Sequence, residues 1–363
     1  MPKLCVMPGD GIGQEVIPAA VAVLQAVIPD LETVEAEAGW ACFLKNGASM
    51  PESTLATIRD CGAGLFGAVS SPSHKVEGYR SAIITMRQAL NLYANVRPVQ
   101  SWPHVSPRPG IDMIIVRENT EGLYSGRERI VDSEQFTVNS GQSGESSIQN
   151  RQSEIVLTAV AERVITRKAS LRIAEKTKQI MTSQGREKLT IVHKANVLPI
   201  TDGLFRDCVK EVFQEISATS APTSARLSTS LRFKIDELLV DVAALKMLED
   251  PERFDVIVTT NLFGDILSDA ASYWGGGLGL APSLNWGDGI AVAEPVHGSA
   301  PDIAGQGIAN PIAAILSAAM LARYVWDLEE AAIRMETAVA HTLTHHPNLN
   351  TTQAITSAIL NEI

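Results

Sequence analysis

Short apolar runs of the kind that form buried strands alternate with stretches of helical periodicity along this chain. Strands are expected at residues 3–7, 63–69, 112–117, 189–193 and 254–259. Helices are expected at 13–27, 80–91, 155–183, 202–216 and 310–323. This alternation predicts an α/β architecture. The length of 363 residues is sufficient for two domains, each with its own core.

The composition excludes several classes of protein. An apolar fraction of 45% and a charged fraction of 20% are ordinary for a soluble globular protein, and a net charge of −11 disfavours a nucleic-acid partner. No apolar run approaches the ~18 residues of a transmembrane helix, and residues 3–7 form a strand with no targeting segment before them. The cysteines lie among apolar neighbours without Cys-x-x-Cys spacing, which indicates buried thiols in a reducing compartment. We therefore expect a cytoplasmic protein without a nucleic-acid or membrane partner.

Two stretches break the alternation. Residues 131–152 are rich in Ser, Gln and Gly, and residues 217–224 are small and polar. Both are expected to be loops or an excursion from the body of the fold.

Asp265 and Asp269 stand four residues apart, directly after the strand expected at 254–259. If this stretch is helical, both carboxylates project from one face, and a divalent cation between them would relieve their repulsion. Mg²⁺ and Mn²⁺ prefer such hard oxygen ligands. An exposed acidic face would show the same spacing, but the strand before the pair and the glycine-rich 275–279 after it favour a cation site.

Arg87, Arg97 and Arg117 recur near strand or turn signals. Guanidinium groups that converge on one pocket would bind carboxylates in bidentate fashion, although scattered surface arginines would have the same spacing. Arg117 opens the polar cluster Arg-Glu-Asn-Thr-Glu-Gly-Leu-Tyr, at a strand end where α/β sheets tend to bind ligands. Tyr124, which ends the cluster, is a candidate proton donor or acceptor, or a half-buried packing residue.

Lys194 follows the strand expected at 189–193, in His-Lys-Ala-Asn. A lysine that ends an apolar strand is partly desolvated, which suits it to proton transfer. A lysine that extends its ammonium group to solvent at a sheet edge fits the sequence equally well.

Two glycine-containing segments are candidates for contact with a ligand. The motif at 9–13, Gly-Asp-Gly-Ile-Gly, lacks the G-x-G-x-x-G spacing of a dinucleotide fingerprint, so a tight strand-to-helix turn is expected instead. The loop 294–310 is rich in small residues, and His297 and Asp302 could bind a nucleoside through hydrogen bonds. An acidic side chain suits a free ribose 2′-hydroxyl, so Asp302 favours NAD over NADP.

Six motifs occur in one order from end to end of the chain, at residues 9–13, 92–98, 117–122, 193–196, 261–269 and 297–310. As a set they resemble the isocitrate/isopropylmalate dehydrogenase family of β-decarboxylating dehydrogenases. Segment 66–79 is most similar to homoisocitrate dehydrogenases. Arg80 and Ser81 resemble the Arg-Ser-x-Asn of isocitrate enzymes, but Ile83 stands in place of the Asn. Some relatives carry an additional arginine where this chain has Ile84.

The resemblance implies a two-domain α/β fold that is not a Rossmann fold. One domain would combine residues 1–101 and 277–363 and bind the cofactor. The central domain, 102–276, would carry substrate and metal residues and an arm that clasps a second subunit, at about 131–152. The expected assembly is a homodimer with shared active sites, or a tetramer.

The resemblance also implies the reaction, an NAD- and divalent-metal-dependent oxidative decarboxylation of a 3-carboxy-2-hydroxy acid. Homoisocitrate, converted to 2-oxoadipate in lysine biosynthesis, is the leading substrate among small tricarboxylates. The rivals are isocitrate and 3-isopropylmalate, a regulatory subunit without catalysis, and a plain nucleotide-binding module.

Site residues follow from the same resemblance. The metal, Mg²⁺ or Mn²⁺, would be held by Asp265, Asp269 and Asp241 of the partner subunit. The catalytic residues would be Tyr124 of the same chain as Asp265, and Lys194 of the partner subunit. Substrate-binding residues would be Ser71, Tyr79, Ser81, Arg87, Arg97, Arg117 and Asn196. Cofactor-binding residues would be Asn261, Glu294, His297, Gly298, Ser299, Ala300, Asp302, Ile303 and Asn310.

Overall fold

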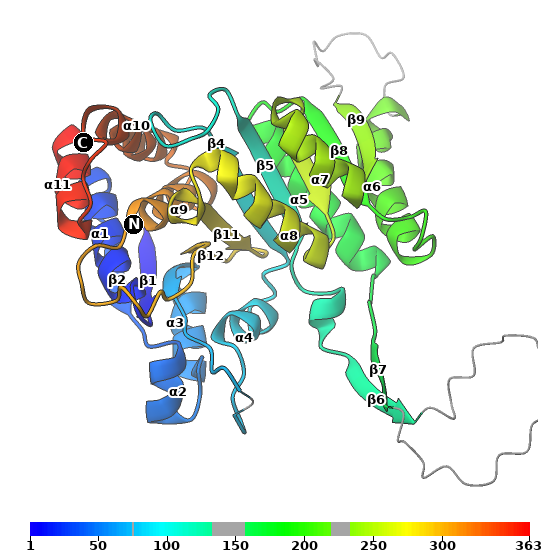
Figure 1. Ribbon diagram of the computed structural model, residues 1–363, viewed down its shortest axis with the longest axis horizontal. Helices are drawn as coiled ribbons and strands as arrows, with labels where there is room; N and C mark the ends of the chain where they lie inside the picture. The colour runs from blue at the N-terminus through cyan, green and yellow to red at the C-terminus, as the bar shows by residue number, and fades with distance from the viewer. Residues whose placement is uncertain (75, 133–156, 219–232) are drawn as a thin grey trace, which may run out of the picture.

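The fold is seen in a computed structural model that describes residues 1–74, 76–132, 157–218 and 233–363. A ten-stranded mixed sheet runs through the molecule in the order β2-β1-β3-β12-β11-β4-β5-β10-β8-β9 (Figure 1). The strands are β1 (Lys3–Gly9), β2 (Glu32–Glu35), β3 (Ala63–Ala68), β4 (Ala94–Gln100), β5 (Asp112–Glu118), β8 (Lys188–His193), β9 (Lys234–Leu239), β10 (Val256–Thr259), β11 (Pro282–Trp286) and β12 (Ala291–Pro295). Every pairing made by β4 or β11 is antiparallel, and the remaining pairings are parallel. The five expected strands all form, and the α/β class is confirmed.

Helices cover the sheet. They are α1 (Gly13–Val27), α2 (Trp40–Asn46), α3 (Glu52–Cys61), α4 (Ala82–Ala89), α5 (Arg167–Ser183), α6 (Thr201–Ala218), α7 (Val240–Glu249), α8 (Asn261–Ser272), α9 (Ile312–Tyr324), α10 (Glu329–His345) and α11 (Thr352–Glu362). Residues 312–322 of α9 are buried on every face of the helix, because α9 packs against β11 and β12 as well as α1 and α10.

The order of strands follows the two parts of the chain. Residues 1–101 and 277–363 supply β2-β1-β3-β12-β11-β4, and residues 102–276 supply β5-β10-β8-β9. The boundary therefore falls between two neighbouring strands, β4 and β5. This arrangement supports the two-domain division, which we keep as a proposal.

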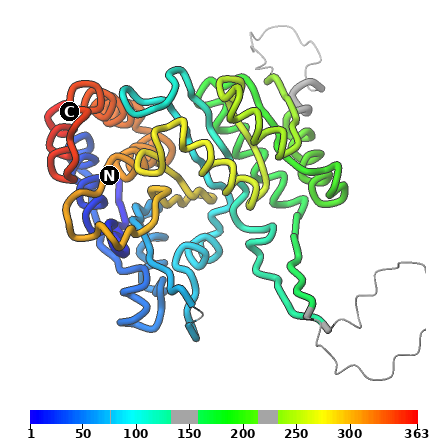
Figure 2. Tube along the Cα trace, viewed as in Figure 1, coloured from blue at the N-terminus to red at the C-terminus, as the bar shows by residue number. Residues whose placement is uncertain are grey.

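The helix expected over 155–183 is wrong at its beginning. Residues 157–161 form strand β7 (Leu157–Ala161), which pairs antiparallel with β6 (Glu128–Asp132) in a ribbon that projects from the body of the molecule (Figure 2). The helix begins only at Arg167, because Thr166 has an extended backbone and its side chain accepts a hydrogen bond from the Ala169 N–H. The unusual segments 131–152 and 217–230 lie almost wholly in 133–156 and 219–232, outside the described residues.

Candidate active site

Strand register brings polar residues into one row across the centre of the sheet. Asn285 on β11 pairs with Asn95 on β4, which in turn pairs with Arg117 on β5. The Asn95 Nδ2 donates to the Asn285 Oδ1 at 3.1 Å, and the Arg97 Nε donates to the Asn95 Oδ1 at 2.9 Å. These groups are buried among apolar strands, so they must satisfy one another. Sequence motifs did not point to Asn285, which stands outside all of them.

The three arginines converge on this row. Arg87, on α4, pairs with Glu294 on β12 at 2.7 Å and donates through Nε to the Asn285 Oδ1 at 3.0 Å. Arg97 reaches the same asparagine through Asn95. All three side chains are buried, and Arg117 is only 1% exposed. Burial, with repulsion from Arg87 and Arg97, lowers the pKa of Arg117 to about 10. The chain therefore concentrates positive charge in a partly desolvated place.

The stretch that carries the acidic pair is helical, and α8 places Asp265 and Asp269 one turn apart. Arg117 Nη1 pairs with the Asp265 Oδ1, and Arg97 Nη1 pairs with the Asp269 Oδ1 at 2.5 Å. No basic side chain stands near this acidic pair in the sequence, but the fold places two arginines beside it, Arg97 on β4 and Arg117 on β5. Burial alone would raise the pKa of the Asp265 carboxyl, yet the Arg117 charge and the Tyr124 hydrogen bond hold that pKa below its usual range.

Tyr124 joins the same cluster. Its hydroxyl donates to the Asp265 Oδ2 at 2.5 Å, and the Arg117 guanidinium lies over its ring at 5.1 Å from the centroid. Burial, followed by the hydrogen bond to Asp265, raises the pKa of Tyr124. The hydroxyl therefore keeps its proton at neutral pH and can act as an acid. Tyr124 also lines a small hollow together with Arg87 and Ile84.

Lys194 and Asp241 form a second cluster, apart from the first. Lys194 follows β8, and its Nζ lies 2.5 Å from the Asp241 Oδ1 in the first turn of α7. Asp202, which is fully buried, accepts a hydrogen bond from the Lys194 backbone N–H at 2.6 Å and so holds the end of β8. Among the described residues, no hydrogen bond or ion pair joins these side chains to Asp265 or Asp269. Asn196 lies exposed in the following turn.

The glycine turn after β1 packs against the loop after β12. A Cβ on Gly11, whose φ is +56°, would lie 2.1 Å from the Ser299 carbonyl oxygen. That carbonyl accepts a hydrogen bond from the Ile12 N–H at 2.9 Å, and the Ser299 hydroxyl lies 2.9 Å from that of Ser70. The tight turn expected at 9–13 is confirmed, and its glycines permit a close approach of backbone to backbone.

The loop 297–310 carries an unsatisfied histidine atom. The His297 Nδ1 lies 3.0 Å from the Gly298 carbonyl oxygen, whereas its Nε2 is buried without a hydrogen-bond partner among the described residues. Burial lowers the pKa of His297, so the ring is neutral, and donation by Nδ1 leaves Nε2 as an acceptor. A donor from a ligand would satisfy it.

Other predicted cofactor residues hold this loop or lie nearby. Asp302 is exposed, and Ala300 and Ile303 are half-buried and joined by a backbone hydrogen bond at 3.1 Å. The Asn310 Oδ1 accepts from the Ile312 N–H at the start of α9. Asn261 lies elsewhere, at the start of α8, where its Oδ1 accepts from Arg117.

The residues expected to recognise the variable end of the substrate lie between β3 and α4. The Tyr79 ring packs edge-on against Trp40 and Phe43 of α2, with centroids 5.3 Å away in both cases. Ser71 is exposed, and its hydroxyl lies 3.5 Å from that of Tyr79. Ser81 directly precedes α4 and makes no capping hydrogen bond through its side chain. The Ser81 carbonyl oxygen accepts a hydrogen bond from the Thr85 N–H at 2.9 Å, so the end of this segment leads directly into α4, which carries Arg87.

The donor set fits a hard divalent cation, because Asp265 and Asp269 present carboxylate oxygens on one face of α8. Within the part of the chain that the structure describes, no three His, Cys, Asp or Glu side chains lie close enough together to bind a metal. None of the described helices is both long and apolar enough to cross a membrane.

With this geometry established, the chain was compared with known proteins. Residues 3–361 match the isocitrate/isopropylmalate dehydrogenase family. The chain belongs to this family. It is therefore an oxidoreductase that catalyses oxidative decarboxylation, and the family expected from the sequence motifs is confirmed.

Individual members agree with this assignment. The chain is 48% identical over 364 residues to an isocitrate/homoisocitrate dehydrogenase of Thermus thermophilus, covering 99% of this chain and 97% of the relative. It is 45% identical over 342 residues to a homoisocitrate dehydrogenase of Methanocaldococcus jannaschii, covering 91% and 87%. The crystal structure of isocitrate dehydrogenase from Methylococcus capsulatus matches with a TM-score of 0.84 at 36% identity, over 100% of this chain and 99% of that one. The family fold, which is not a Rossmann fold, is thus confirmed.

Proposed function

We propose that this enzyme converts homoisocitrate to 2-oxoadipate, with NAD as oxidant and Mg²⁺ or Mn²⁺ as the metal. One observation carries this proposal: Arg87, Arg97 and Arg117 are buried in one hydrogen-bonded network beside Asp265 and Asp269. Clustered guanidinium groups suit a substrate with several carboxylates. The two aspartates suit a cation that binds the same substrate.

A cation held by Asp265 and Asp269 would supply Lewis-acid stabilisation of the charge that develops as CO2 leaves, and NAD held by the loop 297–310 would supply the hydride acceptor. The arginines of the chain bind and orient the substrate carboxylates. Lys194 helps to remove the proton of the 2-hydroxyl group, and Tyr124 supplies the final proton. The position of Tyr124 supports this role, because its hydroxyl lies 2.5 Å from the Asp265 Oδ2, beside the proposed cation site.

The loop 297–310 supports the choice of cofactor. The buried, unpaired His297 Nε2 is an acceptor suited to the amino group of an adenine. Asp302 is exposed at the same loop, where its carboxylate suits a ribose 2′-hydroxyl and repels a 2′-phosphate. We therefore propose NAD in preference to NADP.

A homodimer, alone or as half of a tetramer, would complete the site. Lys194 and Asp241 lie apart from the arginine cluster within one chain, so we propose that each site takes them from the partner subunit. Apolar side chains of α7 and α8 support a subunit interface there, because Leu248 is 62% exposed and Ile266 is 60% exposed. The projecting β6–β7 ribbon would extend this interface.

A cytoplasmic location and a role in lysine biosynthesis stay predictions.

For the identity of the substrate, 3-isopropylmalate competes seriously with homoisocitrate. The names of the Thermus and Methanocaldococcus relatives support homoisocitrate. Ile84 favours 3-isopropylmalate instead, because this apolar side chain is 39% exposed and lines the hollow between Arg87 and Tyr124. An apolar substrate branch would bury it. Isocitrate is the third candidate.

The test is a steady-state assay of the purified chain with homoisocitrate, isocitrate and 3-isopropylmalate, each with NAD or NADP and with Mg²⁺ or Mn²⁺. We expect the highest kcat/KM with homoisocitrate and NAD, and no turnover with EDTA. A higher kcat/KM for either other acid would overturn the substrate assignment. Absence of turnover with all three would favour a regulatory subunit or a plain nucleotide-binding protein.

A further inference from the structure

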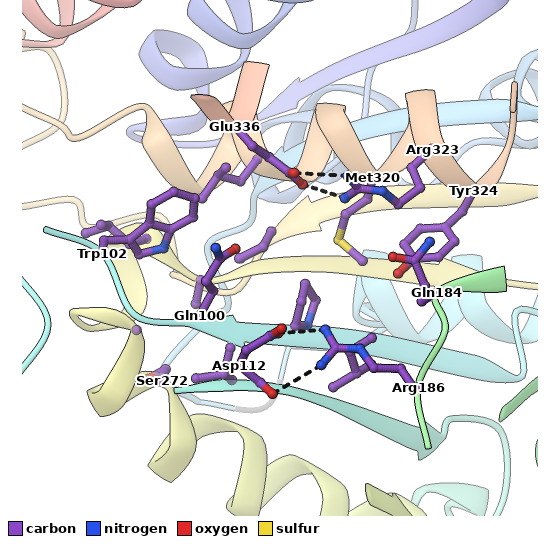
Figure 3. A pocket seen from close by; sticks show the side chains of 18 residues that line it. Gln100, Trp102, Asp112, Gln184, Arg186, Ser272, Met320, Arg323, Tyr324 and Glu336 are labelled. Carbon is purple, nitrogen blue, oxygen red and sulfur yellow. Dashed lines mark hydrogen bonds and ion pairs between the residues drawn. The ribbon is translucent and has the colours of Figure 1, made fainter. Parts of the chain in front are cut away.

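A cavity of about 170 Å³ lies at the opposite end of the central strands from the active site. It is lined by Gln100 at the end of β4, by Asp112 at the start of β5 and by Ser272 at the end of α8, and α9 covers it (Figure 3). In the antiparallel register Gln100 pairs with Asp112, whereas Ala94 pairs with Glu118 at the active-site end. Of the six sequence motifs, 92–98 reaches this cavity through Pro98, and no proposed catalytic role uses the cavity.

The charges around the cavity compensate one another. Arg323 makes a two-pronged ion pair with Glu336, with its Nη2 at 2.9 Å from the Oε2, and Arg186 pairs with Asp112 at 2.6 Å (Figure 3). The cavity therefore offers no unpaired charge to a ligand. A charged ligand would have to break one of these pairs, which is costly for Arg323 and Glu336 because their side chains are only 13% and 29% exposed.

Neutral polar groups remain available. The Tyr324 hydroxyl and the side-chain amides of Gln100 and Gln184 line the cavity and form no hydrogen bond within the described part of the chain. Burial raises the pKa of Tyr324 to about 12, so its hydroxyl is a donor. Met320 provides an apolar surface between these groups, and Trp102 adds another on the far side of Gln100 (Figure 3). The volume is similar to that of a cavity of roughly 150 Å³ that accommodates one benzene ring.

The cavity touches the far ends of the elements that hold the active site. Arg97 lies three residues before Gln100 on β4, and Arg117 lies three residues after Ile114 on β5. On α8, the Ser272 hydroxyl donates to the Asp269 carbonyl oxygen at 2.6 Å. The other wall, α9 and α10, belongs to the part of the chain that carries Glu294. A ligand in the cavity would contact both parts and bias their relative placement.

We propose that this cavity is a regulatory site for a small uncharged planar ring with a hydrogen-bonding edge. The probe is 2-pyridone, a neutral ring with adjacent N–H and C=O groups, and benzoate is its charged counterpart. Binding to the full chain is measured by calorimetry with and without saturating NAD. We expect saturable binding of 2-pyridone that NAD does not displace, much weaker binding of benzoate, and a change of about five-fold in the KM of the acid substrate.

Two variants locate the binding. Tyr324→Phe keeps the ring packed against Trp286 and removes only the hydroxyl, so affinity for 2-pyridone should fall about two- to ten-fold. Met320→Trp should fill the cavity and abolish binding, and Tyr324→Phe still tests the site if that variant misfolds. Absence of saturable binding, displacement by NAD, equal affinity in Tyr324→Phe, or an unchanged KM would each overturn the proposal. The calorimetric measurement needs no turnover, so failure of the proposed function would leave that measurement intact and remove only the KM comparison.

Discussion

Three arginine side chains are buried near the centre of this molecule, which is costly for charged groups unless partners compensate. The chain provides these partners itself: Glu294 for Arg87, Asp269 for Arg97 and Asp265 for Arg117. In the bound state, substrate carboxylates would pair with the arginines in place of some of these acidic residues, and a cation would bind Asp265 and Asp269. At the residue scale, we therefore expect the site to exchange one set of ion pairs for another.

Replacement of Arg117 by alanine tests this view. Loss of a buried charge partner typically costs ~2–5 kcal/mol, which corresponds to a decrease in kcat/KM of roughly thirty-fold to several thousand-fold. The fold should survive, so the circular dichroism spectrum should match that of the parent. Arg108→Ala removes a 42% exposed arginine that pairs with Glu252 and is the matched control, expected to retain activity. Near-normal turnover of Arg117→Ala would refute the site assignment.

Glu121 gives the molecule a specific pH dependence. Its buried carboxylate accepts hydrogen bonds from the N–H and the hydroxyl of Thr166, but burial, the largest effect, raises its pKa from 4.5 to about 7. The folded state therefore holds a proton that the unfolded state loses between these pH values. Stability should accordingly fall as pH rises from about 4.5 to about 7, by on the order of 3 kcal/mol.

The variant Glu121→Gln should lack this decline, because an amide does not ionise. Unfolding by urea at several pH values between 4.5 and 8 would measure the difference from the parent. The exposed Glu330, changed to Gln, is the control and should leave the pH profile as in the parent. Parallel profiles for the parent and Glu121→Gln would contradict the expected role of Glu121.

At the scale of elements, helix α8 and strand β5 are in such close contact that only glycine fits between them. A Cβ at position 264 would lie 2.6 Å from the Arg117 Cγ and 2.7 Å from its Cβ. Those atoms are near the backbone of β5 and cannot move away easily. The spacing of Arg117 from the α8 carboxylates thus depends on a glycine inside the motif 261–269 to which the sequence analysis gave no role.

Gly264→Ala should therefore decrease kcat/KM by on the order of 100-fold, because displacement of Arg117 misplaces its guanidinium group. Gly203, also helical, has nothing within 4 Å of the place that a Cβ would occupy, so Gly203→Ala is the matched control. The control should gain up to about 1 kcal/mol of stability from helix propensity and keep its activity. Equal activity of the two variants would show that Arg117 tolerates the displacement.

Near the site, local sequence signals predicted β5 and α4, but they did not predict β4, β11 or β12, which carry Arg97, Asn285 and Glu294. The helix at 13–27 and the strand at 63–69 form nearly as expected, because apolar periodicity reflects which side of an element is buried. The failure at 157–161 has a physical cause. A short apolar run fits a strand or a helix equally well, and pairing with β6 decides between them.

At the scale of the whole molecule, the separation of Lys194 and Asp241 from Tyr124 and Asp265 predicts sites shared between subunits. Co-expression of Lys194→Ala and Tyr124→Phe chains tests this directly. Each variant alone should be nearly inactive. Random pairing makes about half of the dimers mixed, and each mixed dimer would restore one site of two, giving about a quarter of parental activity. No recovery in verified mixed dimers would contradict shared sites.

The sequence by itself determined the α/β class, the order of the motifs and the residue types that carry the chemistry. These follow from local periodicity and from motifs that lie within a few neighbouring residues. Only the tertiary structure decided that Arg117 pairs with Asp265, that Asn95 and Asn285 connect the arginines, and that Lys194 lies apart from them. Such contacts depend on strand order and register, which join residues far apart in the chain and which no local pattern specifies.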